Sequence, residues 1–347
     1  MRRAARLLLG LAPLASVAAV AVLLSEESDP AAARGGACVR EFGPLPGLPG
    51  GLTAGKDGRL WFSEQLQDRI GSYDPRTRRV REIPVPGGTS PHFMATGPDG
   101  TIWFSGLGDR LGRVDPATGE VELIAAGISP GSMPHAVAPA PDGRHVYFTQ
   151  QEGGSLGRFE VASRRVVELS AALPPVSRPH GLALDPGKRH LWVALQGADR
   201  LARFDLARQR FDRFVRFSAG SGPHDVRVGP DGRTLYVTLQ QGSRLGEYDP
   251  RTGAKREYPA PLPRPSVTDL EPGAKLVDVI ASPTERAVWI TTFMAGALLR
   301  FDVDTKRFAW LRCGITPGSA TLEVANGPDG RIWFTEPIGA RLARLDE

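Results

Sequence analysis

Short apolar runs separated by turn-forming residues recur along the chain after residue 38. One unit, over residues 92–125, consists of HFMATG, a GPDG turn, TIWFS, then RLGRVD, a DPATG turn and EVELIA. Apolar and β-branched runs bounded by Gly, Pro and Asp are typical of β-strands joined by tight turns. The pattern predicts four strands per unit, which we name A to D in chain order.

The unit repeats through the chain with a period near 44 residues. Strand B of each unit contains one aromatic-hydrophobic pair: Trp61-Phe62, Trp103-Phe104, Tyr147-Phe148, Trp192-Val193, Tyr236-Val237, Trp289-Ile290 and Trp333-Phe334. Seven copies of a four-stranded unit predict an all-β, seven-bladed β-propeller. A helical solenoid is disfavoured because these units lack the helix period. One tryptophan or tyrosine per blade is what packing between neighbouring sheets requires.

The last unit ends with strand C, RLARLDE, and lacks a strand D. The segment VREFGPLPG at residues 39–47 is similar to the strand-D segment VREIPVPGG at residues 80–88. We therefore expect residues 39–45 to complete the last blade and close the ring, which removes the open sheet edges.

The two cysteines fall at different ends of this arrangement. Cys38 begins the strand that completes blade 7, whereas Cys313 ends strand D of blade 6. Strands D of neighbouring blades run in the same direction, so five or six residues at roughly 3.3 Å each would separate the cysteines. The sequence predicts that they do not form a disulfide with each other.

The N-terminus has the layout of an export signal. Arg2, Arg3 and Arg6 precede an apolar run from residue 7 to 24, and three alanines at residues 31–33 offer a cleavage site. The run is also long enough to remain as a membrane anchor. We expect residues 1–33 to be a signal peptide or anchor and residues 34–347 to form one propeller domain. The protein would then be extracellular or in the cell envelope, with membrane contact only through residues 7–24.

Composition and charge exclude few classes of function. The chain is 41% hydrophobic and 23% charged, with a formal net charge of +5, and its basic residues are scattered rather than clustered. Nucleic-acid binding therefore has a weak electrostatic case. No serine nucleophile elbow, phosphate-binding loop, CxxC pair or HExxH run is present. We expect a monomer.

A Pro-His pair begins strand A in four adjacent blades, giving His92, His135, His180 and His224. The other three blades have Gly50, Val277 and Leu322 at this position. Strands A line the channel of a propeller, so the four imidazoles would share one mouth of it. Imidazole suits proton transfer near neutral pH or metal binding. The alternative is that each histidine hydrogen-bonds a loop carbonyl and braces its blade. His145 and His190 fall on the opposite face, where we expect surface residues.

The B–C loops open at the same mouth and are rich in amides and carboxylates. A cluster of titratable and polar groups at a concave mouth is a candidate binding site. We expect His180 and His224 to be catalytic, and the candidate substrate-binding residues are His92, His135, Arg178, Gln151, Gln196 and Gln240. The metal ligands, if the site has any, are not identified by the sequence.

Segments such as PHGLAL, LWVALQGADRLARFD and GPDGRIWFTEPIGARLARLD resemble the streptogramin lyases, also called virginiamycin B lyases. The resemblance extends over residues 39–347. It implies a seven-bladed propeller that opens the ester of a cyclic depsipeptide by elimination, with a histidine base and Mg²⁺.

The chain departs from the family's motif at several positions. In the family a glutamate precedes the second Pro-His and another follows the strand-B tryptophan by four residues. Here Ser90, Met133, Arg178 and Gly222 precede the prolines, and Gln196 and Gln240 follow the aromatic residues. Val277 and Leu322 occupy the blades in which the family places its histidine pair.

The resemblance and the histidines together lead to one principal expectation. The protein would be an exported carbon-oxygen lyase in which His180 or His224 takes a proton from a carbon next to an ester carbonyl. Arg178 or a metal, Mg²⁺ by resemblance, would stabilise the enolate. The substrate would be a small molecule or cyclic peptide at the channel mouth. The alternatives are a lactonase-type hydrolase, which needs an acidic metal cage, and a non-catalytic propeller that binds a peptide, glycan or protein in the cell envelope.

Overall fold

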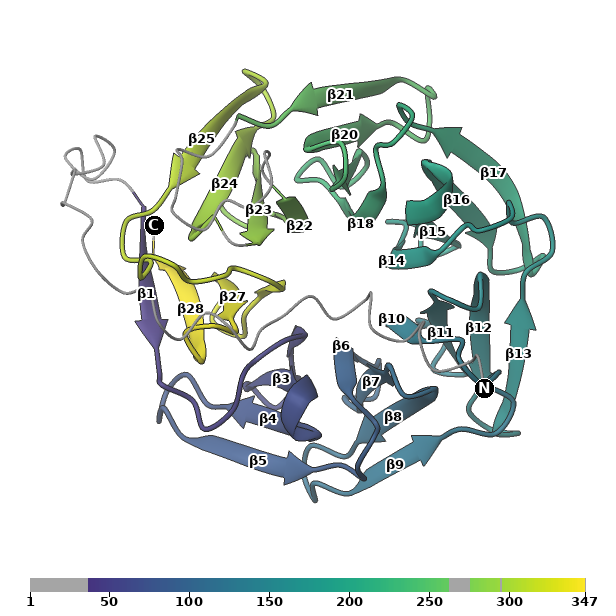
Figure 1. Cartoon of the computed structure of the whole chain (residues 1–347), viewed down its shortest axis with the longest axis horizontal. Coiled ribbons are helices and arrows are strands. Elements are labelled where there is room, and N and C mark those ends of the chain that lie inside the picture. The colour runs from purple at the N-terminus through teal and green to yellow at the C-terminus, as the bar shows by residue number, and fades with distance from the viewer. Residues whose placement is uncertain (1–36, 262–274, 294, 347) are drawn as a thin grey trace, which may run out of the picture.

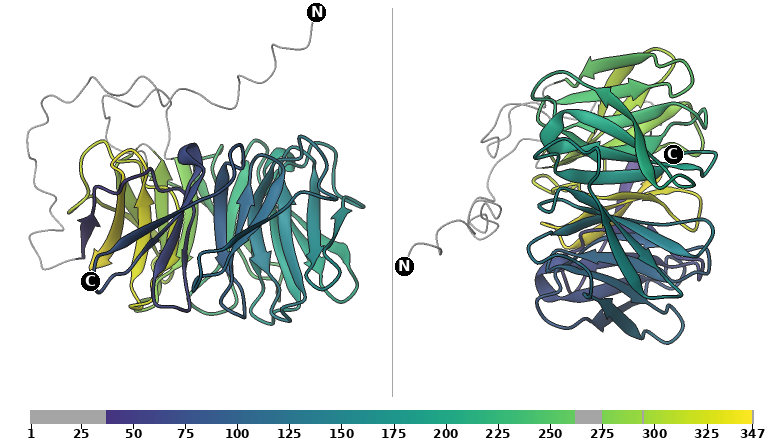
Figure 2. Two further views of the ribbon diagram at one scale, coloured as in Figure 1. Left: turned by 90° about the horizontal axis from the view of Figure 1, so that it is seen from below. Right: turned by 90° about the vertical axis from the view of Figure 1, so that its right-hand side faces the viewer.

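The computed structural model describes residues 37–261, 275–293 and 295–346. Seven four-stranded antiparallel sheets surround a central channel, as the repeat predicts (Figure 1). Seen from the side, the strands cross the thickness of a flat disc (Figure 2). The fold prediction is confirmed.

Each of the first six blades uses four consecutive strands. Blade 1 has β2 (Leu52–Ala54), β3 (Leu60–Glu64), β4 (Arg69–Tyr73) and β5 (Val80–Pro84). Blade 2 has β6 (Pro91–Thr96), β7 (Ile102–Gly106), β8 (Arg110–Val114) and β9 (Val121–Ile124). Blade 3 has β10 (Pro134–Pro139), β11 (His145–Gln150), β12 (Ser155–Glu160) and β13 (Arg165–Leu169).

The later blades follow the same order. Blade 4 has β14 (Pro179–Leu184), β15 (His190–Leu195), β16 (Arg200–Asp205) and β17 (Arg210–Arg216). Blade 5 has β18 (Pro223–Val228), β19 (Leu235–Leu239), β20 (Arg244–Tyr248) and β21 (Lys255–Pro259). Blade 6 has β22 (Lys275–Ala281), β23 (Ala287–Phe293), β24 (Ala297–Asp302) and β25 (Arg307–Leu311). Blade 7 has β26 (Val324–Asn326), β27 (Ile332–Glu336), β28 (Arg341–Asp346) and β1 (Cys38–Phe42). Two short 3₁₀ helices, η3 (Gln65–Gln67) and η4 (Gln196–Ala198), lie in B–C connections.

The hydrophobic core lies between neighbouring sheets. The aromatic residues of strand B are almost completely buried; Trp61, for example, is 1% exposed. Trp61 belongs to a cluster that joins Ile83 of blade 1 to Met94 and Phe104 of blade 2. Each sheet is thus covered on both faces by its neighbours, and an isolated blade would expose two apolar faces.

A hydroxyl group links each blade to the next around the channel, except at one junction. The hydroxyl of Thr149 in β11 donates to the carbonyl of His180 in blade 4 at 2.6 Å and accepts the N–H of Ala136 in its own blade at 2.9 Å. Hydroxyls at the same position donate to the next blade from Ser63, Ser105, Thr238, Thr291 and Thr335. Blade 4 has Ala194 there instead.

These links serve a bulge that recurs in strand A. In β10 the register against β11 shifts between Pro134 and Val137, so His135 and Ala136 have no paired residue in β11. A bulge leaves backbone groups unpaired and redirects side chains. The Thr149 hydroxyl satisfies one of those groups, the Ala136 N–H.

The predicted closure by the N-terminal segment is confirmed. Strand β1 pairs antiparallel with β28, with Val39 opposite Leu345 and Phe42 opposite Leu342. The first and last described strands therefore share one sheet, and blade 7 has four strands like the other six.

The prediction that Cys38 and Cys313 stay apart is wrong. The two form a disulfide with a Cα–Cα distance of 5.0 Å, and the N–H of Val39 donates to the carbonyl of Cys313 at 2.9 Å. Sheet twist rotates the outermost strand of each blade, so that these strands follow one another head to tail around the rim (Figure 1). The end of β25 consequently meets the start of β1. The strand directions were correct, but these outer strands do not lie side by side.

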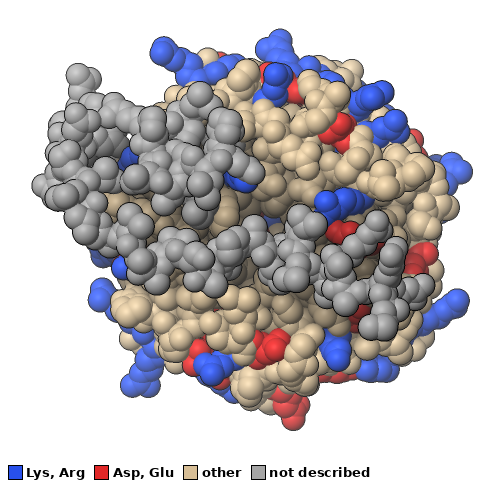
Figure 3. Space-filling model, in the orientation of Figure 1, with Lys and Arg blue, Asp and Glu red and all other residues tan. Residues whose placement is uncertain are grey.

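The expected signal or anchor segment, residues 1–33, and most of the Pro-rich loop after β21, residues 262–274, lie outside the described residues. Within the described ranges, no helix has the length and apolar character needed to cross a membrane. Lys and Arg side chains on the face shown in Figure 3 are interspersed with Asp and Glu around the rim.

We predict that the disulfide is a major part of ring closure. It closes a loop of 275 residues, which corresponds to stabilisation of about 3–5 kcal/mol. Replacing both cysteines with serine should lower the melting temperature by several degrees. Peptide mapping of the oxidised protein without reductant should recover Cys38 linked to Cys313; labelling of both thiols by an alkylating agent would contradict the pairing.

Candidate functional site

The structure brings the four repeated histidines together as one row of rings in contact, which we call the imidazole arc: His92, His135, His180 and His224. The centroids of successive rings are 4.4, 3.7 and 3.8 Å apart along the row. His135 and His180 are buried, and the two outer histidines are half-buried. The arc follows the channel wall over blades 2 to 5.

Hydrogen bonds determine which ring nitrogen carries the proton. The Nδ1 of His180 is 3.0 Å from the carbonyl of His224, and the Nδ1 of His224 is 3.0 Å from the carbonyl of Val277. A carbonyl oxygen only accepts, so both Nδ1 atoms are N–H donors. The Nε2 of each neutral ring then has a lone pair, and neither Nε2 has a hydrogen-bond partner among the described residues. These two histidines have the tautomer that a general base requires.

The other half of the arc is internally connected. The Nδ1 of His92 lies 3.2 Å from the Gln65 side-chain oxygen, and its Nε2 lies 3.0 Å from the Nε2 of His135. If the Nδ1–H of His92 donates to Gln65, the Nε2 of the neutral His92 ring has no proton. The Nε2–H of His135 must then donate to it. The Nδ1 of His135 is then an unprotonated buried atom, and no hydrogen-bond partner is found for it within the described ranges.

Burial keeps the arc uncharged near neutral pH. It lowers the pKa of His92 and of His224 to about 4. Burial also holds the pKa values of His135 and His180 well below the usual range, with a further contribution from the neighbouring imidazoles. Desolvation penalises the protonated form, and neighbouring rings would repel each other if several were charged.

The arc also has the bracing role that we considered as the alternative. Ala194 lacks the hydroxyl with which other blades reach the next one, and at this junction the His180 ring supplies the bond to the His224 carbonyl instead. At the next junction the Val277 carbonyl accepts from both the His224 ring and Thr238. His180 is therefore both a structural link and a candidate base.

The loops before the histidines hold them with a repeated device. Met133 adopts a positive φ of 57°, and its N–H donates to Asp109 of the preceding B–C loop at 3.0 Å. The equivalent aspartates, Asp68 and Asp199, accept N–H groups from the loops before His92 and His224. Each aspartate fixes the turn from which the following histidine enters strand A.

The remaining predicted site residues flank the arc. Arg178 pairs with Glu152 at 2.7 Å in a half-exposed ion pair at the rim. The backbone N–H groups of Gln151, Gln196 and Gln240 donate to the carbonyls just before the Pro-His pairs of their own blades. Gln151 and Gln196 are buried.

Sequence reasoning missed a buried charged cluster at the arc's end. Asp225, Asp278 and Glu323 occupy the position after the histidine site in blades 5, 6 and 7, and all three are at most 6% exposed. Arg227 contacts Asp225 at 2.7 Å and Asp278 at 3.3 Å. The available signal was three acidic residues at the same repeat position in DVRV, DVIA and EVAN.

The three acidic side chains of this cluster differ in the direction of their pKa shifts. Burial raises the pKa values of Asp225 and Glu323 well above the usual range. Burial alone would do the same to Asp278, but the Arg227 guanidinium and the N–H groups of Val279 and Val324 hold its pKa below the usual value. One guanidinium thus pairs with one ionised carboxylate, beside two carboxyls that favour the neutral form.

A second group of buried acids lies at the ends of strands β3 and β27. Glu64 and Glu336 are fully buried, with side-chain oxygens that find no hydrogen-bond partner within the described ranges. Burial and the neighbouring Glu82 raise the pKa of Glu64 to about 7, and burial and Glu41 raise that of Glu336 to about 8. In blade 3 the equivalent residue is Gln150, which donates to Glu168 at 2.6 Å.

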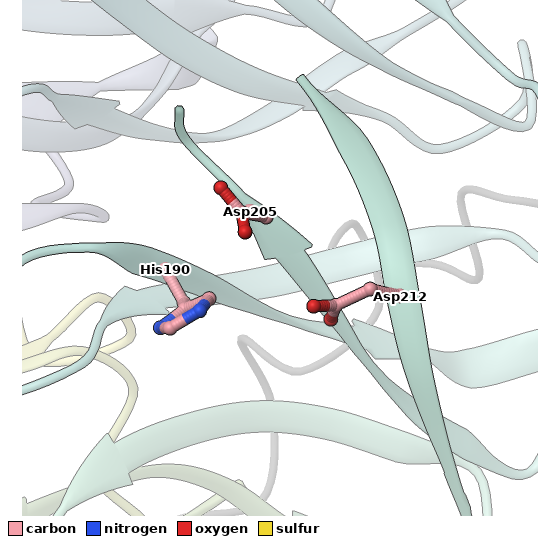
Figure 4. Close-up of side chains that lie close together, drawn as sticks. All are labelled: His190, Asp205 and Asp212. Carbon is pink, nitrogen blue, oxygen red and sulfur yellow. The ribbon is translucent and has the colours of Figure 1, made fainter. Parts of the chain in front are cut away.

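The two histidines on the opposite face are more enclosed than expected. Their side chains are 24% and 20% exposed, and each pairs through Nδ1 with an aspartate: His145 with Asp142 and His190 with Asp185. His190 also lies near Asp205 and Asp212 in an arrangement that could hold a metal (Figure 4).

That cluster is better explained as an ion-pair network. Arg203 binds Asp212 with two nitrogens, both at 2.8 Å, and Arg208 binds Asp205 at 2.6 Å. Hydrogen bonds from the backbone and side chain of Arg208 lower the pKa of Asp205 to about 2. A cation would have to displace two guanidinium groups, so we do not assign a metal here.

Comparison with known proteins agrees with this architecture. A model of the virginiamycin B lyase family matches residues 38–247. The chain belongs to the virginiamycin B lyase family. Curated protein sequences give no match.

Solved structures show the shared fold. A streptogramin B lyase has 21% identity and a TM-score of 0.76, covering 89% of this chain and 97% of that one. A catalytically inactive Staphylococcus aureus virginiamycin B lyase, with a histidine replaced by alanine and quinupristin present, has 18% identity and a TM-score of 0.77, covering 89% and 99%. Hydrazine synthase of Kuenenia stuttgartiensis has 17% identity and a TM-score of 0.69, covering 88% and 97%. At these identities the likeness establishes the fold alone.

We predict that replacing the buried glutamates with glutamine stabilises the protein above neutral pH. The folded state holds the proton more tightly than the unfolded chain, so the free energy of unfolding decreases as pH rises from about 4.5 through about 7 to 8. Glu64→Gln and Glu336→Gln should each gain roughly 2–4 kcal/mol at pH 8.5 relative to pH 5. Denaturant melts at both pH values measure the change in unfolding free energy. Blade 3 already has a glutamine, Gln150, at this position. An unchanged pH dependence would contradict the buried-proton interpretation.

The bracing role of His180 is testable by a double-mutant cycle. His180→Ala should cost about 1 kcal/mol of unfolding free energy in the natural sequence, because the His224 carbonyl loses its donor. Ala194→Ser restores the hydroxyl that other blades have, so His180→Ala should cost less in that background. Ser105→Ala is the matched control at a junction with a hydroxyl link. Equal costs in both backgrounds would rule out the brace.

Proposed function

We propose that the protein is an exported carbon-oxygen lyase that opens an ester or lactone linkage by elimination at the imidazole arc. The observation that supports this most is the state of His180 and His224. Both rings have Nδ1–H tied to a backbone carbonyl and an Nε2 lone pair without a partner in the described ranges. Their lowered pKa values keep them unprotonated near neutral pH.

In the proposed reaction the Nε2 of His224 or His180 accepts the proton from a carbon next to a carbonyl. The electron pair left behind forms a carbon–carbon double bond as the carbon–oxygen bond at the next carbon breaks. The leaving oxygen departs as a carboxylate, and the proton remains on the imidazole until it passes to water. No water is added, so a cyclic substrate opens without a change in mass.

The base is held in place by the bonds that also support the ring of blades. Since Nδ1 donates to a carbonyl of the next blade, the imidazole cannot rotate without losing that bond. A preoriented base lowers the entropy cost of reaching the transition state. His92, His135, Gln151, Gln196 and Gln240 would then position the substrate, and Arg178, already at the rim, would contact enolate charge.

The residues present do not fit a Mg²⁺ site of the kind that the resemblance implies. Mg²⁺ prefers carboxylate oxygens, but Arg178 and Gly222 precede the relevant prolines and Gln196 and Gln240 follow the aromatic residues. Two of the carboxylates at the end of the arc, Asp225 and Asp278, are engaged by Arg227. We therefore derive no step through a metal.

Export is supported by the disulfide and by the N-terminal sequence. Disulfides persist in oxidising compartments such as the extracellular space or periplasm, and Cys38 lies just after the predicted signal or anchor.

The family names and one neighbouring structure suggest the first substrate to try. A histidine-to-alanine variant of the S. aureus enzyme is described as catalytically inactive and was crystallised with quinupristin. We would incubate the protein with quinupristin and weigh the product. Elimination gives an opened product of unchanged mass, hydrolysis adds one water, and tight binding without conversion would favour the non-catalytic alternative.

We predict that His224→Ala and His180→Ala each lower turnover by about 10² to 10⁴. His145→Ala, on the opposite face, is the control and should leave turnover unchanged. Equal losses in all three variants would place the chemistry elsewhere.

The pH profile gives an independent check. Because the pKa of His224 is lowered to about 4, the base stays unprotonated and kcat/KM should remain level from pH 8 down to about 5, then fall as the ring gains a proton. A fall centred near pH 6.5 would indicate an ordinary exposed imidazole and would contradict a buried base.

A further inference from the structure

The channel contains a cavity whose lining includes none of the four histidines of the imidazole arc. It has a volume of about 590 Å³ and is lined by strand A of all seven blades, toward the ends of those strands that lead into the A–B turns. We call this cavity the channel cup. Its volume is within the usual range for small-molecule sites.

One layer of the cup has mostly small side chains. In each blade, one lining residue lies opposite the first residue of the strand-B pair: Thr53, Ala95, Ala138, Ala183, Arg227, Ile280 and Ala325. Four alanines and a threonine leave the centre of the channel open at this level. Arg227 is the one charged side chain among the described residues that line the cup.

Arg227 reaches across the channel. It belongs to β18, while its guanidinium carbon lies 5.7 Å from the ring centroid of Phe93 in β6, on the opposite side (Figure 1). Asp225 and Asp278 hold the guanidinium at 2.7 and 3.3 Å. The side chain remains 23% exposed. It therefore forms part of the cup's wall and is still accessible.

The charges favour an anion that approaches through the cup. A ligand in the cup meets the guanidinium first, and the acids are not among the cup's lining residues. The guanidinium is permanently charged, and Asp225 and Asp278, which pair with it, lie outside the cup's lining. A guanidinium offers five N–H donors in a planar fork that matches a carboxylate.

We propose that the channel cup binds an amphiphilic carboxylate, with its carboxylate group at Arg227 and its apolar tail against the alanine layer. The ligand would be a monocarboxylic acid with a medium-length alkyl or aryl tail. The site is independent of the proposed lyase reaction, because it uses none of the four histidines of the imidazole arc.

Calorimetric titration with three probes of equal tail length tests this proposal. Octanoate, octylammonium and octanamide differ only in the head group. We expect one octanoate per chain, bound at least tenfold more tightly than either other probe. Equal binding of octylammonium or octanamide would overturn the proposal, as would no octanoate binding.

Variants locate the bound probe. Ala138→Leu and Ala183→Leu fill the cup and should weaken octanoate binding at least tenfold, whereas Ala309→Leu, on the exposed side of β25, should not change it. The double variant Arg227→Met/Asp278→Asn removes one positive and one negative charge at the same time. It should reduce the affinity for octanoate to that for octanamide. If that double variant does not fold, the two alanine variants decide. Octanoate affinity unchanged by both would overturn the proposal.

Discussion

The carbonyl at the start of each strand A is the group on which the ring of blades depends. In blades 2 to 6 a bulge leaves this carbonyl without a partner in its own sheet, and in every blade a side chain of the preceding blade donates to it. Most of these donors are hydroxyls of strand B, and they are completely buried. A buried carbonyl left without a donor would cost about 1–3 kcal/mol. Each junction therefore needs some donor, and the chemistry of the channel mouth follows from which donor the sequence supplies.

At the junction between blades 4 and 5 the donor is an imidazole. With Ala194 in place of a hydroxyl, the His224 carbonyl is satisfied by His180, and this bond fixes the His180 tautomer. Bracing and base chemistry are thus not competing explanations, because the Nδ1–H that braces the blade is what leaves Nε2 unprotonated. His180 is 6% exposed and hydrogen-bonded between blades, so its ring belongs to the support of the fold as well as to the candidate site.

The sequence was sufficient to predict the features that every blade shares, and insufficient to predict the contacts that differ from blade to blade. Period, aromatic pairs and turns predicted every blade, and the likeness of residues 39–47 to a strand D predicted the closure. The disulfide was missed because strand direction alone does not include the accumulated twist that brings Cys313 to Cys38. Asp225, Asp278 and Glu323 were missed because each is one residue past the repeated histidine position. Only the fold shows that consecutive blades place them around one arginine.

The two ends of the channel consequently offer different chemistry to a ligand. At the arc, burial keeps four adjacent imidazoles neutral, so this end offers lone pairs and amide groups but little net charge. At the cup, one guanidinium keeps its charge at every accessible pH because a buried carboxylate stabilises it. Replacing such a buried pair with apolar residues often stabilises a protein, so core packing alone does not explain why one charged side chain lies among the uncharged residues that line the cup. Contact with an anion from the cup, the role that we propose, would explain it, because an apolar residue of similar volume could not supply that charge.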